Sequence, residues 1–219
     1  MTYIPCILCL VIAALFMYKE YQKRYVPAVT FKSLASFCFV LFGIQNSTGE
    51  SRVDTMILIG LILGMIADVL LNLRFVLKNG KPVFLAAILV FLAGHIMYLL
   101  AVFPMAPHKI IIIIASVVLT ALLMKWIITK ITAEKAFKLF GIVYIGAIVM
   151  LNCTAAVNAV FLPSAFTRMF AAGAFLFLIS DIILILNRFG KESKLAMCVA
   201  NLALYYIGQL LIAGSLMHL

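Results

Sequence analysis

Apolar stretches long enough to span a bilayer recur along this chain from end to end, separated only by short polar segments. A transmembrane helix needs about 20 mostly apolar residues. Because 67% of the 219 residues are hydrophobic and 11% are charged, no soluble core would hold this much apolar surface. The pattern predicts an all-α polytopic membrane protein with one transmembrane domain, 1–219. We place eight spans at residues 3–18, 30–46, 54–73, 82–103, 108–128, 136–158, 165–187 and 195–217.

The basic residues between the spans favour one side of the membrane. One side carries Lys19, Lys23, Arg24, Lys32, Arg74, Lys78, Lys81, Lys125, Lys130, Lys135, Lys138, Arg188, Lys191 and Lys194, and the other carries Arg52, Lys109 and Arg168. By the positive-inside rule, the loops after the first, third, fifth and seventh spans are cytoplasmic and both termini face outward. The net charge of +10 is therefore a topology signal. We expect an integral protein of a bacterial cytoplasmic membrane, with no nucleic-acid partner.

An internal repeat relates the third span to the seventh. Each has a glycine eight residues before an aspartate, with apolar residues matching around it. The matched residues are Gly60 with Gly173, Asp68 with Asp181, Arg74 with Arg188, and Gly94 with Gly208. The chain therefore divides into two four-helix halves, about 1–104 and 105–219. Because the two matched spans run in the same direction, we expect parallel repeats around a central cleft that receives both aspartates.

Asp68 and Asp181 are the first candidates for function. A carboxylate in hydrocarbon costs at least about 2.5 to 3.5 kcal/mol, so an intramembrane aspartate is by default a functional hypothesis. At 1.5 Å per residue, both lie roughly 21 to 24 Å from the outer boundary of a core about 30 Å thick. They share a depth in its cytoplasmic third. The alternative is that each is a structural group bonded to a neighbouring helix.

Polar residues at helical spacing accompany these aspartates. Gly60, Gly64, Asp68 and Asn72 form one face of the third span, and the small residues there admit a neighbouring helix. Two further sets that could line the same cleft are Phe91, His95 and Tyr98 on the fourth span, and Asn201, Tyr205 and Gln209 on the eighth. Lys32, near the cytoplasmic end of the second span, could snorkel, pair with an aspartate or hold a phosphate.

Metal and nucleotide chemistry are weakly supported. Two of the three histidines, His108 and His218, fall at the outer ends of spans, so a three-histidine zinc site is not indicated. Two carboxylates with His95 remain an alternative ligand set. The GxSxG, HExxH and P-loop motifs do not occur, which argues against the common serine-hydrolase, metalloprotease and nucleotide-driven functions. We expect no metal and no cofactor.

These residues resemble the YhhN family of membrane proteins, which includes the animal transmembrane lysoplasmalogenases, over nearly the whole chain. The motifs that carry the resemblance are G-x-x-A-D-x-L-L at 64–71, the H-x-x-Y pair of His95 and Tyr98, G-x-x-L-F-x-x-S-D-x-x-L-x-x-N-R-F at 173–189, and the segment 205–209. The third motif is the most specific. The family's lysine at the start of the second span corresponds to Lys32, but the proline that usually follows it is Ser33 here.

Family members characterised as enzymes hydrolyse the vinyl-ether bond of lysoplasmalogens, releasing a fatty aldehyde and a glycerophospho head group. The resemblance implies that Asp68 and Asp181 are the catalytic pair in this chain. The residues then expected to bind substrate are Lys32, Asn72, His95, Tyr98, Ser180, Asn187, Tyr205 and Gln209. The substrate would be a lysophospholipid amphiphile entering sideways from the bilayer, with its phosphate near Lys32 or the cytoplasmic loops.

The chemistry fits these residues independently of the resemblance. Cleaving a vinyl ether requires protonation of a carbon to give an oxocarbenium ion, which water captures, and one acid with one base suffices. The leading rival is a proton-coupled transporter, because parallel repeats with an intramembrane aspartate pair are also transporter features. A purely structural scaffold is a third alternative, but it leaves the cost of two buried carboxylates unexplained.

Overall fold

The computed structural model describes residues 3–132, 135–190, 192 and 194–219. In this part of the chain, eight α-helices are long and apolar enough to cross a membrane. They are α1 (Ile4–Tyr21), α2 (Tyr25–Asn46), α3 (Arg52–Leu73), α4 (Gly80–Val102), α5 (Lys109–Lys130), α6 (Lys135–Phe161), α7 (Ala165–Phe189) and α8 (Leu195–Ser215), followed by the short 3-10 helix η1 (Leu216–His218). The predicted all-α polytopic fold is confirmed.

The ends of the helices follow local sequence signals. Ser51 caps α3 by accepting a hydrogen bond from the backbone N–H of Asp54, and Ser164 and Thr167 form a reciprocal capping box at the start of α7. One boundary differs clearly from the prediction, because α2 begins at Tyr25 rather than near residue 30. Pro27 therefore lies in the first turn of the helix, where a missing backbone N–H is tolerated.

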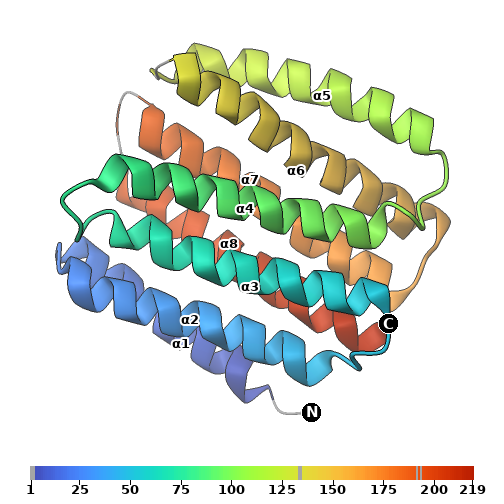
Figure 1. Cartoon of the computed structure of the whole chain (residues 1–219), viewed down its shortest axis with the longest axis horizontal. Helices are drawn as coiled ribbons and strands as arrows, with labels where there is room; N and C mark the ends of the chain where they lie inside the picture. Colours follow the sequence, from blue (N-terminus) through green and yellow to red (C-terminus); the bar gives the residue numbers. More distant parts are fainter. Residues whose placement is uncertain (1–2, 133–134, 191, 193) are drawn as a thin grey trace.

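The helices alternate in direction, so the loops after α1, α3, α5 and α7 gather at one end of the molecule (Figure 1). Two of these loops touch: Ile131 forms an isolated β-bridge with Gly190, and the Thr132 N–H donates to the Phe189 carbonyl. The start of α1 and the end of α8 lie at the other end. Residues 133–134 and Lys191, which belong to two of the predicted cytoplasmic loops, lie outside the described residues. Membrane orientation stays a prediction.

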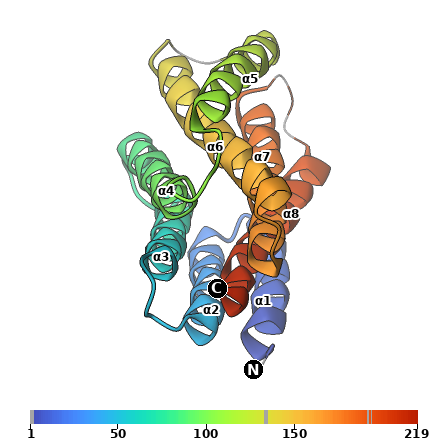
Figure 2. The same ribbon diagram turned by 90° about the vertical axis from the view of Figure 1, so that its right-hand side faces the viewer.

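Helix contacts in one half have counterparts in the other. The pairs α1–α2, α2–α3 and α3–α4 pack together, as do α5–α6, α6–α7 and α7–α8, and the contact of α2 with α8 is matched by that of α6 with α4. Figure 2 shows α6 crossing between the α3–α4 pair and the α7–α8 pair. This is the pattern that two four-helix repeats would produce. Their superposition about the membrane normal and the shared cleft stay predictions.

Glycines allow close helix crossings in both halves. A Cβ on Gly94 would lie 3.3 Å from the Gly60 carbonyl oxygen, and one on Gly208 would lie 2.9 Å from the Gly173 carbonyl oxygen. Side chains larger than hydrogen would push these backbones apart. The four glycines matched in the sequence repeat therefore form two equivalent contacts, one between α3 and α4 and one between α7 and α8.

Candidate active site

Asp68 lies on the buried face of α3 that the sequence predicted. Gly60, Gly64, Asp68 and Asn72 are all buried. The two glycines make room for polar neighbours, because a Cβ on Gly60 would collide with the Tyr98 ring and one on Gly64 would come 2.9 Å from the Gln209 amide nitrogen. Because these glycines have no side chain, Tyr98 from α4 and Gln209 from α8 pack directly against α3. They do so about two turns and one turn before Asp68 along the helix.

The Asp68 carboxylate is fully hydrogen-bonded and paired with a cation. Its Oδ1 lies 3.2 Å from Lys32 Nζ, and its Oδ2 accepts hydrogen bonds of 2.6 Å from both the Ser36 and the Tyr205 hydroxyl groups. Lys32 also donates to Asn72 Oδ1 over 3.3 Å. Asp68 is 1% exposed and Lys32 is 3% exposed. A contacting ammonium and two hydroxyl donors thus offset the cost of burying this carboxylate.

A chain of hydrogen bonds extends this cluster to α4. Gln209 donates from its amide nitrogen to the Tyr205 hydroxyl over 3.4 Å, and the Tyr98 hydroxyl donates to Gln209 Oε1 over 2.9 Å. The structure therefore joins five of the predicted binding residues to Asp68 directly or through one another. They are Lys32, Asn72, Tyr98, Tyr205 and Gln209.

Asp181 has a much simpler environment. It is 4% exposed, and its hydrogen-bond donor among the described residues is the hydroxyl group of Tyr144, at 2.8 Å from Oδ2. Tyr144 comes from α6 and is itself buried. A neutral phenol is the partner here, whereas a lysine pairs with Asp68. The two carboxylates therefore occupy chemically different surroundings although the sequence repeat makes them equivalent.

Aromatic rings connect the partners of the two carboxylates. Tyr205 packs on Phe177 with ring centroids 5.2 Å apart, Phe177 packs on His95 at 4.6 Å, and His95 packs on Tyr144 at 5.5 Å. All of these contacts are edge-to-face, the arrangement that aromatic rings prefer. The series begins at Tyr205, whose hydroxyl group donates to Asp68, and ends at Tyr144, whose hydroxyl group donates to Asp181.

Of the two ring nitrogens of His95, one has a hydrogen-bond partner within the described structure and the other has none. Its Nδ1 lies 2.7 Å from the Phe91 carbonyl oxygen. Since a carbonyl only accepts, Nδ1 carries the proton, and in the neutral ring Nε2 is an acceptor. Nε2 is buried and has no hydrogen-bond partner within the described structure. An orphaned acceptor in an active-site candidate is a natural partner for a water or a substrate hydroxyl.

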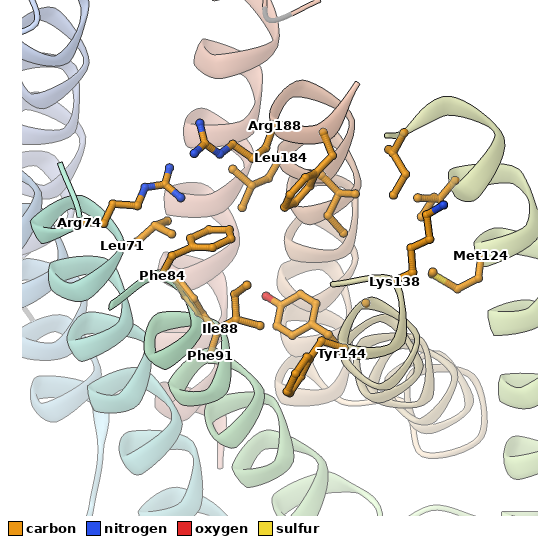
Figure 3. A pocket seen from close by; sticks show the side chains of 16 residues that line it. Leu71, Arg74, Phe84, Ile88, Phe91, Met124, Lys138, Tyr144, Leu184 and Arg188 are labelled. Carbon is orange, nitrogen blue, oxygen red and sulfur yellow. The ribbon is translucent and has the colours of Figure 1, made fainter. Parts of the chain in front are cut away.

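A pocket of about 80 Å³ lies in this region, and Figure 3 shows the side chains that line it. Its walls are mostly apolar. They include Ile88 and Phe91 from α4 and Leu184 from α7, and the ring of Tyr144 lines the same space. Lys138, Arg74 and Arg188 add positive charge to its lining. The pocket thus touches the residue that bonds Asp181, and it has the apolar character that an alkyl chain requires.

Two predicted binding residues, Ser180 and Asn187, belong neither to the hydrogen-bond network around Asp68 nor to the ring series. Ser180 is bonded by the Asn201 side chain, which donates to its carbonyl and hydroxyl oxygens at 2.8 Å each, so it ties α7 to α8. Asn187 accepts from the Lys194 backbone N–H over 2.7 Å and organises the loop between these helices. Conversely, the sequence analysis did not select Ser36 or Tyr144, which donate to the two carboxylates. The described residues contain no group of three or more His, Cys, Asp or Glu side chains placed to hold a metal.

The fold and this interior define a class: a polytopic α-helical membrane protein with two buried, separately bonded carboxylates. The YhhN family model matches residues 27–216, which is most of the chain. The protein belongs to the YhhN family. No curated protein sequence and no solved structure matches the chain.

Proposed function

We propose that this protein is a membrane hydrolase that cleaves the vinyl-ether bond of lysoplasmalogens. The observation that carries the proposal is the unequal pair of buried carboxylates, one bonded by Lys32 and the other by the phenol of Tyr144. Removal from water favours the protonated form of a carboxyl group, whereas an adjacent ammonium favours the ionised form. Environments that differ in this way assign the acid and base roles. Family membership supports the same reaction class.

The reaction would proceed in two stages. Asp181, as the acid, gives its proton to the β-carbon of the vinyl ether, and the positive charge spreads over the α-carbon and the ether oxygen. Asp68, as the ionised partner, stabilises this oxocarbenium ion and removes a proton from the water that attacks the α-carbon. In the collapse of the resulting hemiacetal, the C–O bond to glycerol breaks as Asp68 gives its proton to the departing glycerol oxygen and Asp181 takes the proton of the hemiacetal hydroxyl group, which leaves an alcohol and a fatty aldehyde. One water is consumed, and the protons return to the starting distribution.

The pocket would give the substrate a route to the carboxylates. A lysophospholipid is already dissolved in the leaflet, and an apolar opening between helices admits its chain without passage through water. Tyr144 lines the pocket and donates to Asp181, so a chain in the pocket would lie beside the proposed acid. The unpartnered Nε2 of His95 would accept a hydrogen bond from the attacking water or from the free hydroxyl group of the glycerol.

A proton-coupled transporter is the second candidate. The observation that favours it is the hydrogen-bonded series from Asp68 through Tyr205 and Gln209 to Tyr98, because buried polar chains of this kind conduct protons in pumps and transporters. A transporter would release no aldehyde. Proton uptake into proteoliposomes in response to a solute gradient would favour this candidate over the hydrolase.

The deciding experiment is aldehyde release from a lysoplasmenyl lipid by the purified protein in detergent. We expect Asp68→Asn and Asp181→Asn each to abolish turnover, and the double variant to be no worse than either single variant, because groups that act as one unit are strongly non-additive. The pH dependence of the wild-type rate should be bell-shaped, since one carboxyl group must be protonated and the other ionised.

Asp54→Asn is the matched control. Asp54 is also buried, but its carboxylate accepts from the Gly49 backbone N–H at the start of α3, and an amide oxygen can still accept that bond. This variant should keep its turnover. If Asp181→Asn retained most of the wild-type rate, the proposed mechanism would be wrong.

A further inference from the structure

Two arginines line the pocket at the end of the molecule that is predicted to be cytoplasmic. Arg74 directly follows the end of α3, and Arg188 lies in the last turn of α7. Their guanidinium carbons lie 4.6 Å and 5.9 Å from the centroid of the same ring, that of Phe84. Figure 3 shows the two side chains directed toward one another beside that ring. These are also the arginines that the sequence repeat pairs, one from each half of the chain.

The two arginines place like charges close together at this position. The Nε and Nη1 atoms of Arg74 are buried and have no hydrogen-bond partner in the described structure. Burial and then the nearby Arg188 charge lower the pKa of Arg74 to about 10, and Glu20 opposes this shift. Arg74 therefore stays cationic at neutral pH. Two like charges beside unsatisfied N–H donors form a site that an anion would stabilise.

The rest of the pocket continues from these cations as an apolar slot. Phe84, Ile88 and Leu184 line it between the arginines and Tyr144 (Figure 3). Arg188 follows Asp181 by seven residues, which is about 10 Å along a helix axis. In a single-chain glycerophospholipid, the phosphate is separated from the ether-linked chain by the glycerol backbone. An anion at the arginines would therefore leave the ether group deeper in the slot, toward Tyr144 and Asp181.

We propose that Arg74 and Arg188 bind the phosphate group of a single-chain phospholipid whose alkyl chain occupies the pocket beneath them. Guanidinium groups suit this role because they offer parallel N–H donors to the oxygens of a phosphate. Lys32, the earlier candidate for this role, is instead occupied by Asp68 and Asn72. The identity of the cleaved bond rests on the function proposed above, but the phosphate site does not, so the two can be tested separately.

The test compares two non-cleavable ligands with the same chain: a saturated alkyl-ether lysophospholipid and a monoalkylglycerol, which lacks the phosphate. Arg188→Gln is the main variant, because Arg188 is exposed and its replacement should not disturb folding. We expect its affinity for the phospholipid to fall about ten- to a hundredfold, with no change for the alkylglycerol. Arg74→Gln should behave alike, and Arg188→Lys should recover part of the loss.

Arg168→Gln is the matched control, since Arg168 is an exposed arginine at the opposite end of α7, and it should bind both ligands as the wild type does. Unchanged phospholipid affinity in Arg188→Gln, or equal weakening of both ligands, would overturn the assignment. Displacement of the phospholipid by inorganic phosphate at the same concentration would also overturn it, by indicating a site for free phosphate. Arginine-dependent binding without aldehyde release would refute the hydrolase alone.

Discussion

Replacing Lys32 with methionine should destabilise the protein strongly. The lysine and Asp68 are 3% and 1% exposed, and Nζ lies 3.2 Å from the carboxylate. Methionine removes the ammonium and leaves a buried carboxylate with its two hydroxyl donors but no contacting cation. Removing one partner of a buried pair costs about 3–5 kcal/mol. At about 2–4 °C per kcal/mol for a chain of this size, Tm should fall by roughly 6–20 °C.

A second substitution should restore the stability without restoring activity. In Lys32→Met/Asp68→Asn both charges are gone, and the new amide oxygen can still accept from Ser36 and Tyr205, which donate to Asp68 in the native protein. We expect this double variant to recover most of the lost Tm, because replacing both members of a buried pair is often nearly neutral. Both variants should release no aldehyde. Thermal unfolding in detergent, followed by circular dichroism, measures the first effect and the aldehyde assay the second.

Lys78→Met serves as the control, since Lys78 is exposed in the loop after α3 and its loss should change Tm little. If Lys32→Met had the same Tm as the wild type, the ion pair would not contribute to stability. A double variant that melts no higher than the single one would show that Lys32 acts through packing, for example on the Phe16 ring 5.3 Å from its nitrogen, rather than through charge.

Three further outcomes are expected. Tyr144→Phe, which removes the hydroxyl bonded to the second carboxylate, should lower kcat about tenfold or more with a stability change of about 1 kcal/mol; a wild-type rate would contradict this. Gly208→Ala should destabilise by about 1–3 kcal/mol, because its Cβ would lie 2.9 Å from the Gly173 carbonyl oxygen, whereas Gly146→Ala, with its nearest neighbour at 3.7 Å, should melt with the wild type. Asn79→Cys in a cysteine-free background should resist labelling from outside intact cells, and ready labelling would reverse the predicted topology.

The helices were predictable because the bilayer leaves few choices. A chain in hydrocarbon must satisfy its backbone internally, so each apolar run becomes a helix, and its ends follow nearby breakers such as Pro104 and Pro163. The predicted start of α2, near residue 30, lies beyond Pro27, because a proline commonly marks a loop. Proline is acceptable in the first turn, where no N–H is needed, and the helix extends to Tyr25.

The polar interior was only partly predictable, since a sequence pattern places residues on a helix face but does not say which face meets which helix. The α3 face was evident from its four-residue spacing. Tyr144 and Ser36 were missed, because one tyrosine or serine in an apolar helix is usually unremarkable. Asn187 was selected through the family motif, and the structure places it in a loop contact, which motif membership alone does not distinguish from substrate binding.

The repeat contains a signal for Tyr144 that becomes visible once the contacts are known. Helix α6 occupies in the second half the position of α2 in the first, and Tyr144 precedes Asp181 by nearly the same interval as Lys32 precedes Asp68. Each residue contacts its own aspartate. If the halves arose from one ancestral unit, they have kept the carboxylate and exchanged the group that bonds it.

This exchange explains how one repeated motif would supply two different catalytic groups. Identical surroundings would give both aspartates the same preference for the proton, so that an acid and a base would not coexist at one pH. An ammonium on one side and a phenol on the other separate those preferences. Lys32 would thus hold Asp68 as the anion, and Tyr144 would leave Asp181 able to carry the proton that the vinyl ether receives. Tyr144→Lys, which makes the two surroundings alike, should therefore abolish aldehyde release while preserving the fold, because both carboxylates would then be ionised.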